Sequence, residues 1–140
     1  MNQQNIDNLI PVAVEYLSKS QNRVVKDGKV IDSAYSTYLS SFGPTIIQSG
    51  MMKALAVYAK EEGDAKRYVI DEFVKKIMIN KNVIEGKYDR TDIHLIDIYI
   101  DKIKDKNDLD RMEFEDRILE TIIACKLALQ LFHIEKNKKS

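Results

Sequence analysis

The apolar run near the C-terminus constrains the fold of this chain more than any other feature. A helix through residues 118–134 would carry apolar side chains on most of its circumference. These are Ile118, Leu119, Ile122, Ile123, Cys125, Leu127, Leu129, Leu131 and Phe132. A helix that is apolar nearly all round is buried on all sides. We therefore expect a long apolar C-terminal helix at the centre of an all-α bundle.

Apolar residues also recur at helical spacing in five segments that precede this helix. The predicted helices cover about residues 4–22, 32–43, 44–61, 65–81 and 91–103, and the last helix begins near Asp110, with Glu113 completing its capping pair. The chain has 140 residues, of which 44% are hydrophobic and 31% charged. This composition predicts one globular domain, residues 1–140, with about six helices and a frayed basic tail at 136–140.

The segment at residues 91–103 is ambiguous. Isoleucine favours strands, and Ile93 and Leu95 alternate with polar residues. Ile93, Ile96, Ile100 and Ile103 fit a helix better. Since the sequence offers no partner strand, we predict a helix.

Two glycine positions interrupt the most apolar part of the chain. Gly43 followed by Pro44 predicts a corner between two helices. Gly50 would then lie inside the helix at 44–61, where glycine costs about 1 kcal/mol relative to alanine. We expect a close approach at Gly50 and Ala54 to another helix or to a partner, which makes them candidate interface residues.

The charges exclude a strongly basic protein and leave room for local contacts. The net charge is zero, so the chain lacks the overall basic field of an autonomous nucleic-acid-binding protein. Lys75-Lys76, beside Asp71-Glu72, are interpreted as a solvated helix face. Lys126 lies within the apolar helix, either as a lysine whose stem is covered or as a contact for a phosphate or a buried carboxylate. The candidate nucleic-acid-binding residues are Arg23, Lys26 and Lys29 around the first turn, Lys53, and Lys126.

The chemistry-bearing residues give little support to an enzyme. Neither histidine follows a glutamate by three residues, there is no P-loop, and Cys125 lies in the apolar run as an expected inert thiol. Arg90 and His94 have three intervening residues, whereas helical ribonucleases use four to six. We predict no catalytic, cofactor or metal site. The sequence also lacks a signal-like N-terminus and a long apolar span, which predicts a cytoplasmic protein without a membrane segment.

The region around Pro44 resembles a known family. An aromatic-rich helix leads into a proline, aliphatic residues follow, and then Gly-Met, two variable positions and Ala-Leu-Ala with an aromatic. The residues are Tyr38-Leu39, Pro44, Ile46-Ile47, Gly50-Met51, Ala54-Leu55-Ala56 and Tyr58. This pattern is similar to that of the small all-helical subunit of the Cmr-type (type III-B) CRISPR effector complex. The chain departs from the family at Gly43, where leucine is expected, and at Ala124-Cys125-Lys126-Leu127, which lacks the family's tryptophan.

The resemblance implies a non-catalytic subunit that stacks in a filament alongside guide and target RNA in antiviral defence. Its expected partners are the other subunits of a Cmr-type complex and RNA held by electrostatic contacts, with weak or no self-association in isolation. One alternative is an unrelated helical adaptor or regulator that acts through protein–protein contacts. A helical ribonuclease that uses Arg90 and His94 is a third hypothesis.

Overall fold

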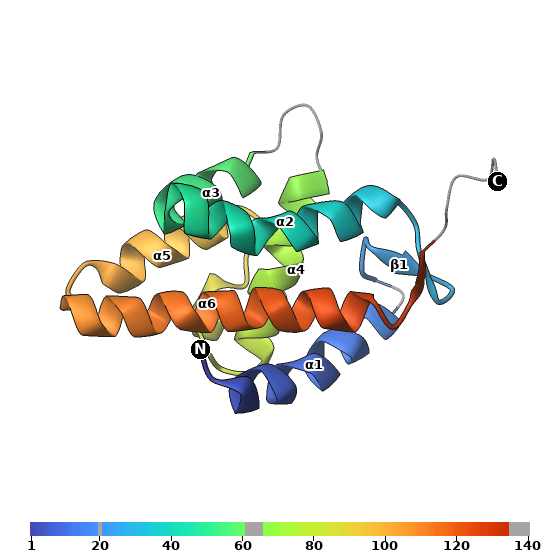
Figure 1. The fold of residues 1–140 in the computed structure, drawn as a ribbon, viewed down its shortest axis with the longest axis horizontal. Helices are drawn as coiled ribbons and strands as arrows, with labels where there is room; N and C mark the ends of the chain where they lie inside the picture. The colour runs from blue at the N-terminus through green and yellow to red at the C-terminus, as the bar shows by residue number, and fades with distance from the viewer. Residues whose placement is uncertain (20, 61–65, 135–140) are drawn as a thin grey trace.

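The computed structural model describes residues 1–19, 21–60 and 66–134, and in these residues it confirms the all-α bundle (Figure 1). The six α-helices of the described part are α1 (Gln3–Ser18), α2 (Ser33–Ser49), α3 (Met51–Tyr58), α4 (Lys66–Asn80), α5 (Leu95–Ile103) and α6 (Asp108–Leu129). The strands β1 (Val25–Lys26), β2 (Lys29–Val30) and β3 (His133–Ile134) and the 3₁₀ turn η1 (Gly86–Tyr88) complete these elements. No described helix is long and apolar enough to cross a membrane.

Helix α6 lies along the molecule and packs against α1, α2 and α4 (Figure 1). It ends at Leu129, so residues 133–134 form a strand rather than its last turn. Asn107 is its N-cap and accepts a hydrogen bond from the backbone N–H of Asp110, which corrects the predicted start at Asp110 with Glu113. The expectation of an apolar circumference is not supported either, because the helix begins with exposed charged residues and buries Glu120.

The predicted corner at Gly43-Pro44 is wrong, because α2 runs through both residues without a break. Pro44 removes one helical N–H, but it is exposed, as is Ser40, whose carbonyl would have accepted that bond. The chain turns instead at Gly50, which ends α2 and precedes α3 with φ 91° and ψ 158°. Gly50 therefore stands between two helices rather than inside one.

The remaining elements follow the predicted periodicity closely. Asp32 caps α2, and its side chain accepts a hydrogen bond from the N–H of Ala34. Residues 95–103 form a helix, as predicted, although residues 91–94 precede it. The junction of the helices predicted at 44–61 and 65–81 and the tail predicted at 136–140 lie outside the described residues.

The turn predicted at residues 26–29 is confirmed, and it joins two short strands that the sequence analysis missed. Asp27 and Gly28 both have positive φ, 55° and 76°, as a two-residue hairpin loop of type I′ requires. Strand β2 pairs antiparallel with β1 and parallel with β3, so the residues after α6 lie beside the hairpin.

Aromatic contacts hold the helices around one core. Phe42 of α2 stacks on Tyr58 of α3 with ring centroids 3.8 Å apart, and Tyr16 of α1 stacks on Phe73 of α4 at 5.2 Å. Cys125 is fully buried, and this burial raises the pKa of its thiol well above the ordinary value, as expected for an inert core cysteine.

Candidate functional site

The predicted cations do not form one patch. Arg23, Lys26 and Lys29 are exposed around the β1–β2 hairpin, at one end of the molecule. Lys53 is exposed on α3, toward the other end (Figure 1). Lys126 is half-buried on α6. The structure therefore separates the candidates into a hairpin group and two lysines elsewhere.

Of the hairpin group, Lys26 lines a cavity of about 510 Å³. Apolar side chains of Leu17, Val25 and Phe132 line it together with Lys19, Lys26 and the carboxylate of Asp27. Cations and an acid thus share this end of the molecule, which weakens its attraction for a polyanion.

Lys126 belongs to the half-exposed side of α6. Six residues before it, Glu120 accepts a hydrogen bond from the amide of Asn5 on α1 at 3.0 Å. At 3.6 residues per turn, Lys126 points about 120° away from Glu120. This direction turns it away from the contact that Glu120 makes with α1. Among the described residues no carboxylate pairs with it, which leaves the covered stem and the phosphate contact as its two interpretations.

The structure gives Gly50 a different explanation from close packing. Nothing lies within 4 Å of a Cβ built on Gly50, and its φ of 91° is one that side-chain-bearing residues rarely adopt. Ala54 is fully buried and has no surface to offer a partner. A partner contact at the exposed Gly50 stays a prediction.

Lys75 and Asp71 correct the interpretation of a solvated face on α4, because both are buried. The Lys75 ammonium donates hydrogen bonds to the carbonyls of Arg90 and Ile93, at 2.6 and 2.8 Å. It also lies 3.3 Å from Oε1 of Glu72. Of the two lysines predicted on a solvated face, Lys76 is partly exposed, and it pairs with Asp89 at 2.6 Å.

Asp71 holds the start of α5. Its carboxylate accepts the N–H of Leu95 at 3.3 and 3.4 Å and lies 3.8 Å from Nδ1 of His94. Burial raises the pKa of Asp71, while the hydrogen bonds from His94 and Leu95 act in the opposite direction. Together, Asp71 and Lys75 fasten the segment before α5 onto α4, which is a structural task.

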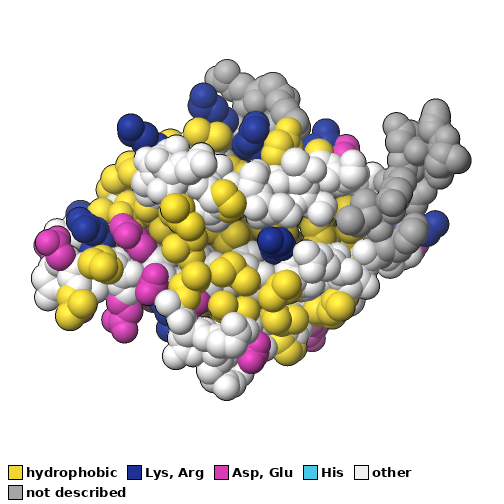
Figure 2. Space-filling view, viewed as in Figure 1, with side chains coloured by type: hydrophobic (Ala, Val, Ile, Leu, Met, Phe, Trp, Pro, Cys, Tyr) yellow, Lys and Arg dark blue, Asp and Glu magenta, His cyan; other side chains and the backbone are white. Residues whose placement is uncertain are grey.

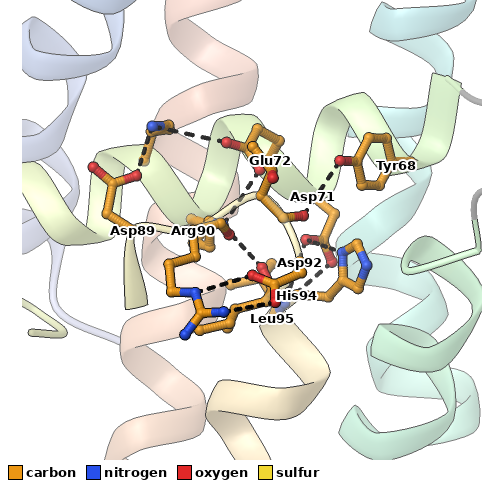
Figure 3. Close-up of polar contacts among 12 residues, drawn as sticks. Tyr68, Asp71, Glu72, Asp89, Arg90, Asp92, His94 and Leu95 are labelled. Carbon is orange, nitrogen blue, oxygen red and sulfur yellow. Dashed lines mark hydrogen bonds and ion pairs between the residues drawn. The ribbon is translucent and has the colours of Figure 1, made fainter. Parts of the chain in front are cut away.

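Arg90 and His94 engage different partners, so the pairing considered for a ribonuclease does not form. The Arg90 guanidinium donates to both carboxylate oxygens of Asp92, at 3.1 and 2.9 Å (Figure 3). The His94 ring faces Asp71 and the edge of Tyr68, with ring centroids 5.2 Å apart.

The contacts that two arginines make with tyrosine rings were missed by the sequence analysis. The Arg67 guanidinium lies 4.4 Å from the ring centroid of Tyr38 and 5.9 Å from that of Tyr58. Arg23 lies 5.8 Å from the ring centroid of Tyr68. No local pattern could have indicated these pairs, because each joins segments that are distant in the sequence.

No family model, curated protein or solved structure matches this chain. Within the described residues no cluster of three or more His, Cys, Asp or Glu side chains could hold a metal ion.

Proposed function

We propose that this protein is a non-catalytic small subunit of an RNA-guided Cmr-type (type III-B) CRISPR effector complex. In this role it stacks in a filament alongside guide and target RNA. The partners are the other subunits of the complex and RNA bound through electrostatic contacts. The protein acts in the cytoplasm as part of antiviral defence, and its self-association in isolation is weak.

One observation carries the proposal: the residues that resemble the family form a single structural unit. They occupy α2, the turn at Gly50, and α3. The Tyr58 hydroxyl donates a hydrogen bond to the carbonyl of Tyr38 at 2.6 Å, and Leu39 and Leu55 are both buried. The segment is thus a helix pair with internal contacts, which supports its interpretation as a shared structural motif rather than a chance pattern.

The distribution of charge also supports a subunit that acts in many copies. A protein with no net charge and a few local cations binds a polyanion weakly as a single copy. Aligned copies add their contacts, because each further one binds at a high effective concentration. Sequence would be read by pairing between guide and target, while the protein contacts backbone and shape.

Purification from the native host tests the proposal. The chain, tagged and expressed at its native level, is isolated under mild salt, and its partners are identified by mass spectrometry and RNA sequencing. We expect CRISPR effector subunits and guide RNA to co-purify with it. Recovery of neither, from cells in which the effector complex is expressed, would contradict the proposal.

A helical adaptor without RNA is the second candidate function. Several apolar side chains are open to solvent, among them Ile47 of α2, 77% exposed, and Leu109 of α6, 75% exposed. Apolar side chains on the surface favour protein contacts when they gather in a patch. In the same purification, an adaptor would bring down protein partners and no guide RNA.

A further inference from the structure

The acidic residues of this chain are unevenly distributed. The chain contains 22 Asp and Glu residues, yet none lies between Asp32 and Glu61. Lys53 and Lys60 are the charged residues of that stretch. This stretch forms α2 and α3, so the structure gathers the acid-free residues into one helix pair.

The exposed residues of α2 carry no charge, and two of them, Pro44 and Ile47, are apolar. Its exposed residues include hydroxyl and amide side chains, namely Ser33, Thr37, Ser40, Ser41, Gln48 and Ser49. On the face in Figure 2, acidic side chains gather toward the α5–α6 end and below α6, while the middle of α2 is uncharged. Such a surface presents no negative charge to repel a phosphate backbone.

Two other elements that pack against this helix pair, α4 and α6, also carry cations. Arg67 of α4 lies over Tyr38 of α2 at 4.4 Å. Lys66, its neighbour, lies 3.4 Å from Asp32, so the acid at the start of α2 is neutralised. Lys126 is half-buried on α6, which packs against α2. Figure 2 shows a Lys or Arg side chain between α2 and α6. Among the described residues of this helix pair and its borders, Lys53, Lys60, Lys66 and Arg67 outnumber Asp32, while Glu61, Glu62 and Asp64 follow α3 in the sequence.

We propose that the face formed by α2 and α3 is where single-stranded RNA lies against this subunit, with phosphates neutralised by Lys53, Arg67 and Lys126. This inference rests on the proposed function and assigns the RNA to one surface. The hairpin cations Lys26 and Lys29 are secondary, because Asp27 lies between them. The face binds the phosphate backbone electrostatically, and this binding does not depend on the RNA sequence.

Arg67 adds a planar contact to this face. Its guanidinium carbon lies 4.4 Å from the ring centroid of Tyr38 and 5.9 Å from that of Tyr58. Arginine planes stack on unpaired bases in RNA recognition, and we expect Arg67 to serve this purpose here. A lysine would keep the charge and lose the stacking.

Two matched triple variants test the assignment. The face variant replaces Lys53, Arg67 and Lys126 with Gln, and the hairpin variant replaces Arg23, Lys26 and Lys29 with Gln. Both remove three positive charges. Binding of the purified full chain to a fluorescein-labelled oligouridine is measured by anisotropy over a series of low salt concentrations. Circular dichroism and urea unfolding confirm that each variant is folded.

We expect the face variant to flatten the log–log salt slope by about 2, since each neutralised phosphate on a single strand contributes about 0.7. Its affinity should fall at least about tenfold at the lowest salt, which is the loss expected from three phosphate contacts. The hairpin variant should bind within about twofold of the wild type. Arg67→Lys should keep the slope and lower the affinity. If the triple face variant does not fold, Lys53→Gln and Lys126→Gln should each flatten the slope by about 0.7.

Three results would overturn the assignment. The first is an equal loss of oligouridine affinity in the two triple variants, and the second is a larger loss of affinity in the hairpin variant. The third is no binding of oligouridine by the wild type at the lowest salt. If the face variant instead loses protein partners in the host purification and keeps its RNA affinity, a protein covers this face. The wild type could also show the expected salt slopes with oligouridine and yet recover no CRISPR subunits in the host purification. That result would support the RNA face and reject the proposed complex.

Discussion

At the scale of single residues, Gly50 shows that a glycine can be required by backbone conformation alone. Its φ and ψ of 91° and 158° lie in a region that is essentially restricted to glycine. A side chain there costs about 1–3 kcal/mol whatever its size. We therefore expect Gly50→Ala and Gly50→Leu to lower the free energy of unfolding by similar amounts, as measured by urea denaturation.

Gly43 is the matched control for this prediction. It also has no atom within 4 Å of an added Cβ, but it lies inside α2 with helical geometry. Gly43→Ala should stabilise the protein by up to about 1 kcal/mol, because alanine has the higher helix propensity. A much larger loss for Gly50→Leu than for Gly50→Ala would indicate crowding and contradict the backbone explanation.

Lys75 and Lys76 are neighbours with opposite environments, and they give the second residue-scale prediction. Lys75 is fully buried and bonded to two backbone carbonyls, whereas the Lys76 side chain is 34% exposed. Lys75→Met leaves both carbonyls without that donor and should lower the free energy of unfolding by about 2–4 kcal/mol. Lys76→Met should change it by less than about 1 kcal/mol. Equal losses of unfolding free energy for the two variants, measured by urea denaturation, would show that the buried hydrogen bonds of Lys75 do not stabilise the fold.

The positions of these lysines could not be derived from the sequence. Both follow Asp71 and Glu72 in a pattern that is typical of an exposed helix face. What buries Lys75 is the segment at residues 90–93, which lies across α4 and offers its carbonyls. That arrangement depends on tertiary structure, and no local sequence pattern predicts it.

At the scale of elements, the attachment of α5 to α4 should depend on pH through Asp71. Its pKa is raised mainly by burial, so the folded protein binds this proton more tightly than the unfolded chain. The stability that the protonated Asp71 carboxyl contributes is fully present below its unfolded pKa of about 3.9. This contribution is lost as pH rises through the folded pKa. Asp71→Asn cannot ionise and still offers an oxygen to Leu95. Its stability relative to the wild type should therefore increase as pH rises from about 4 toward neutrality.

Asp101 provides a control with the opposite sign. Hydrogen bonds from Tyr88 and then Lys104 lower the pKa of this exposed carboxyl. Its contribution is present above the unfolded pKa and is lost as pH falls through the folded pKa. Asp101→Asn should therefore lose stability relative to the wild type as pH rises through the unfolded pKa of about 3.9, and the difference should stay nearly constant from about pH 5 toward neutrality. Urea unfolding at a series of pH values measures both variants, and a flat or falling difference for Asp71→Asn would reject the account of its burial.

The helices themselves were largely predictable, while the junctions were not. Hydrophobic periodicity indicated helices in all six regions because each helix buries one face against the same core. The Gly43-Pro44 pair suggested a break, but an exposed proline is tolerated when the lost hydrogen bond faces water. The strands were missed because each has two residues, which is too short for an alternating pattern.

At the scale of the whole molecule, charge segregation is the property most relevant to the proposed function. The zero net charge correctly excluded an overall basic field, but it concealed the acid-free stretch at residues 33–60. That stretch was visible in the sequence as a local absence of Asp and Glu. The contributions of Arg67 and Lys126 could not be seen in the sequence. They depend on the packing of α4 and α6 against α2.

The segregation also predicts where the protein tolerates negative charge. Thr37→Asp and Ser40→Asp place a carboxylate on the exposed surface of α2, where stability should change by less than about 0.5 kcal/mol. Oligouridine binding at low salt should nevertheless weaken. The same substitution at Ser18, exposed at the end of α1, serves as the control. Equal binding by all three variants would argue against a phosphate backbone along α2.

Photochemical cross-linking of RNA to the protein in its native assembly tests the central claim most directly. The complex isolated from the host is irradiated and digested, and the RNA-bearing peptides are identified by mass spectrometry. The α2–α3 face predicts cross-links within residues 33–60 and around Arg67, with Tyr38 among the attachment sites. Cross-links confined to the hairpin at residues 23–30, with none on α2 or α3, would contradict it.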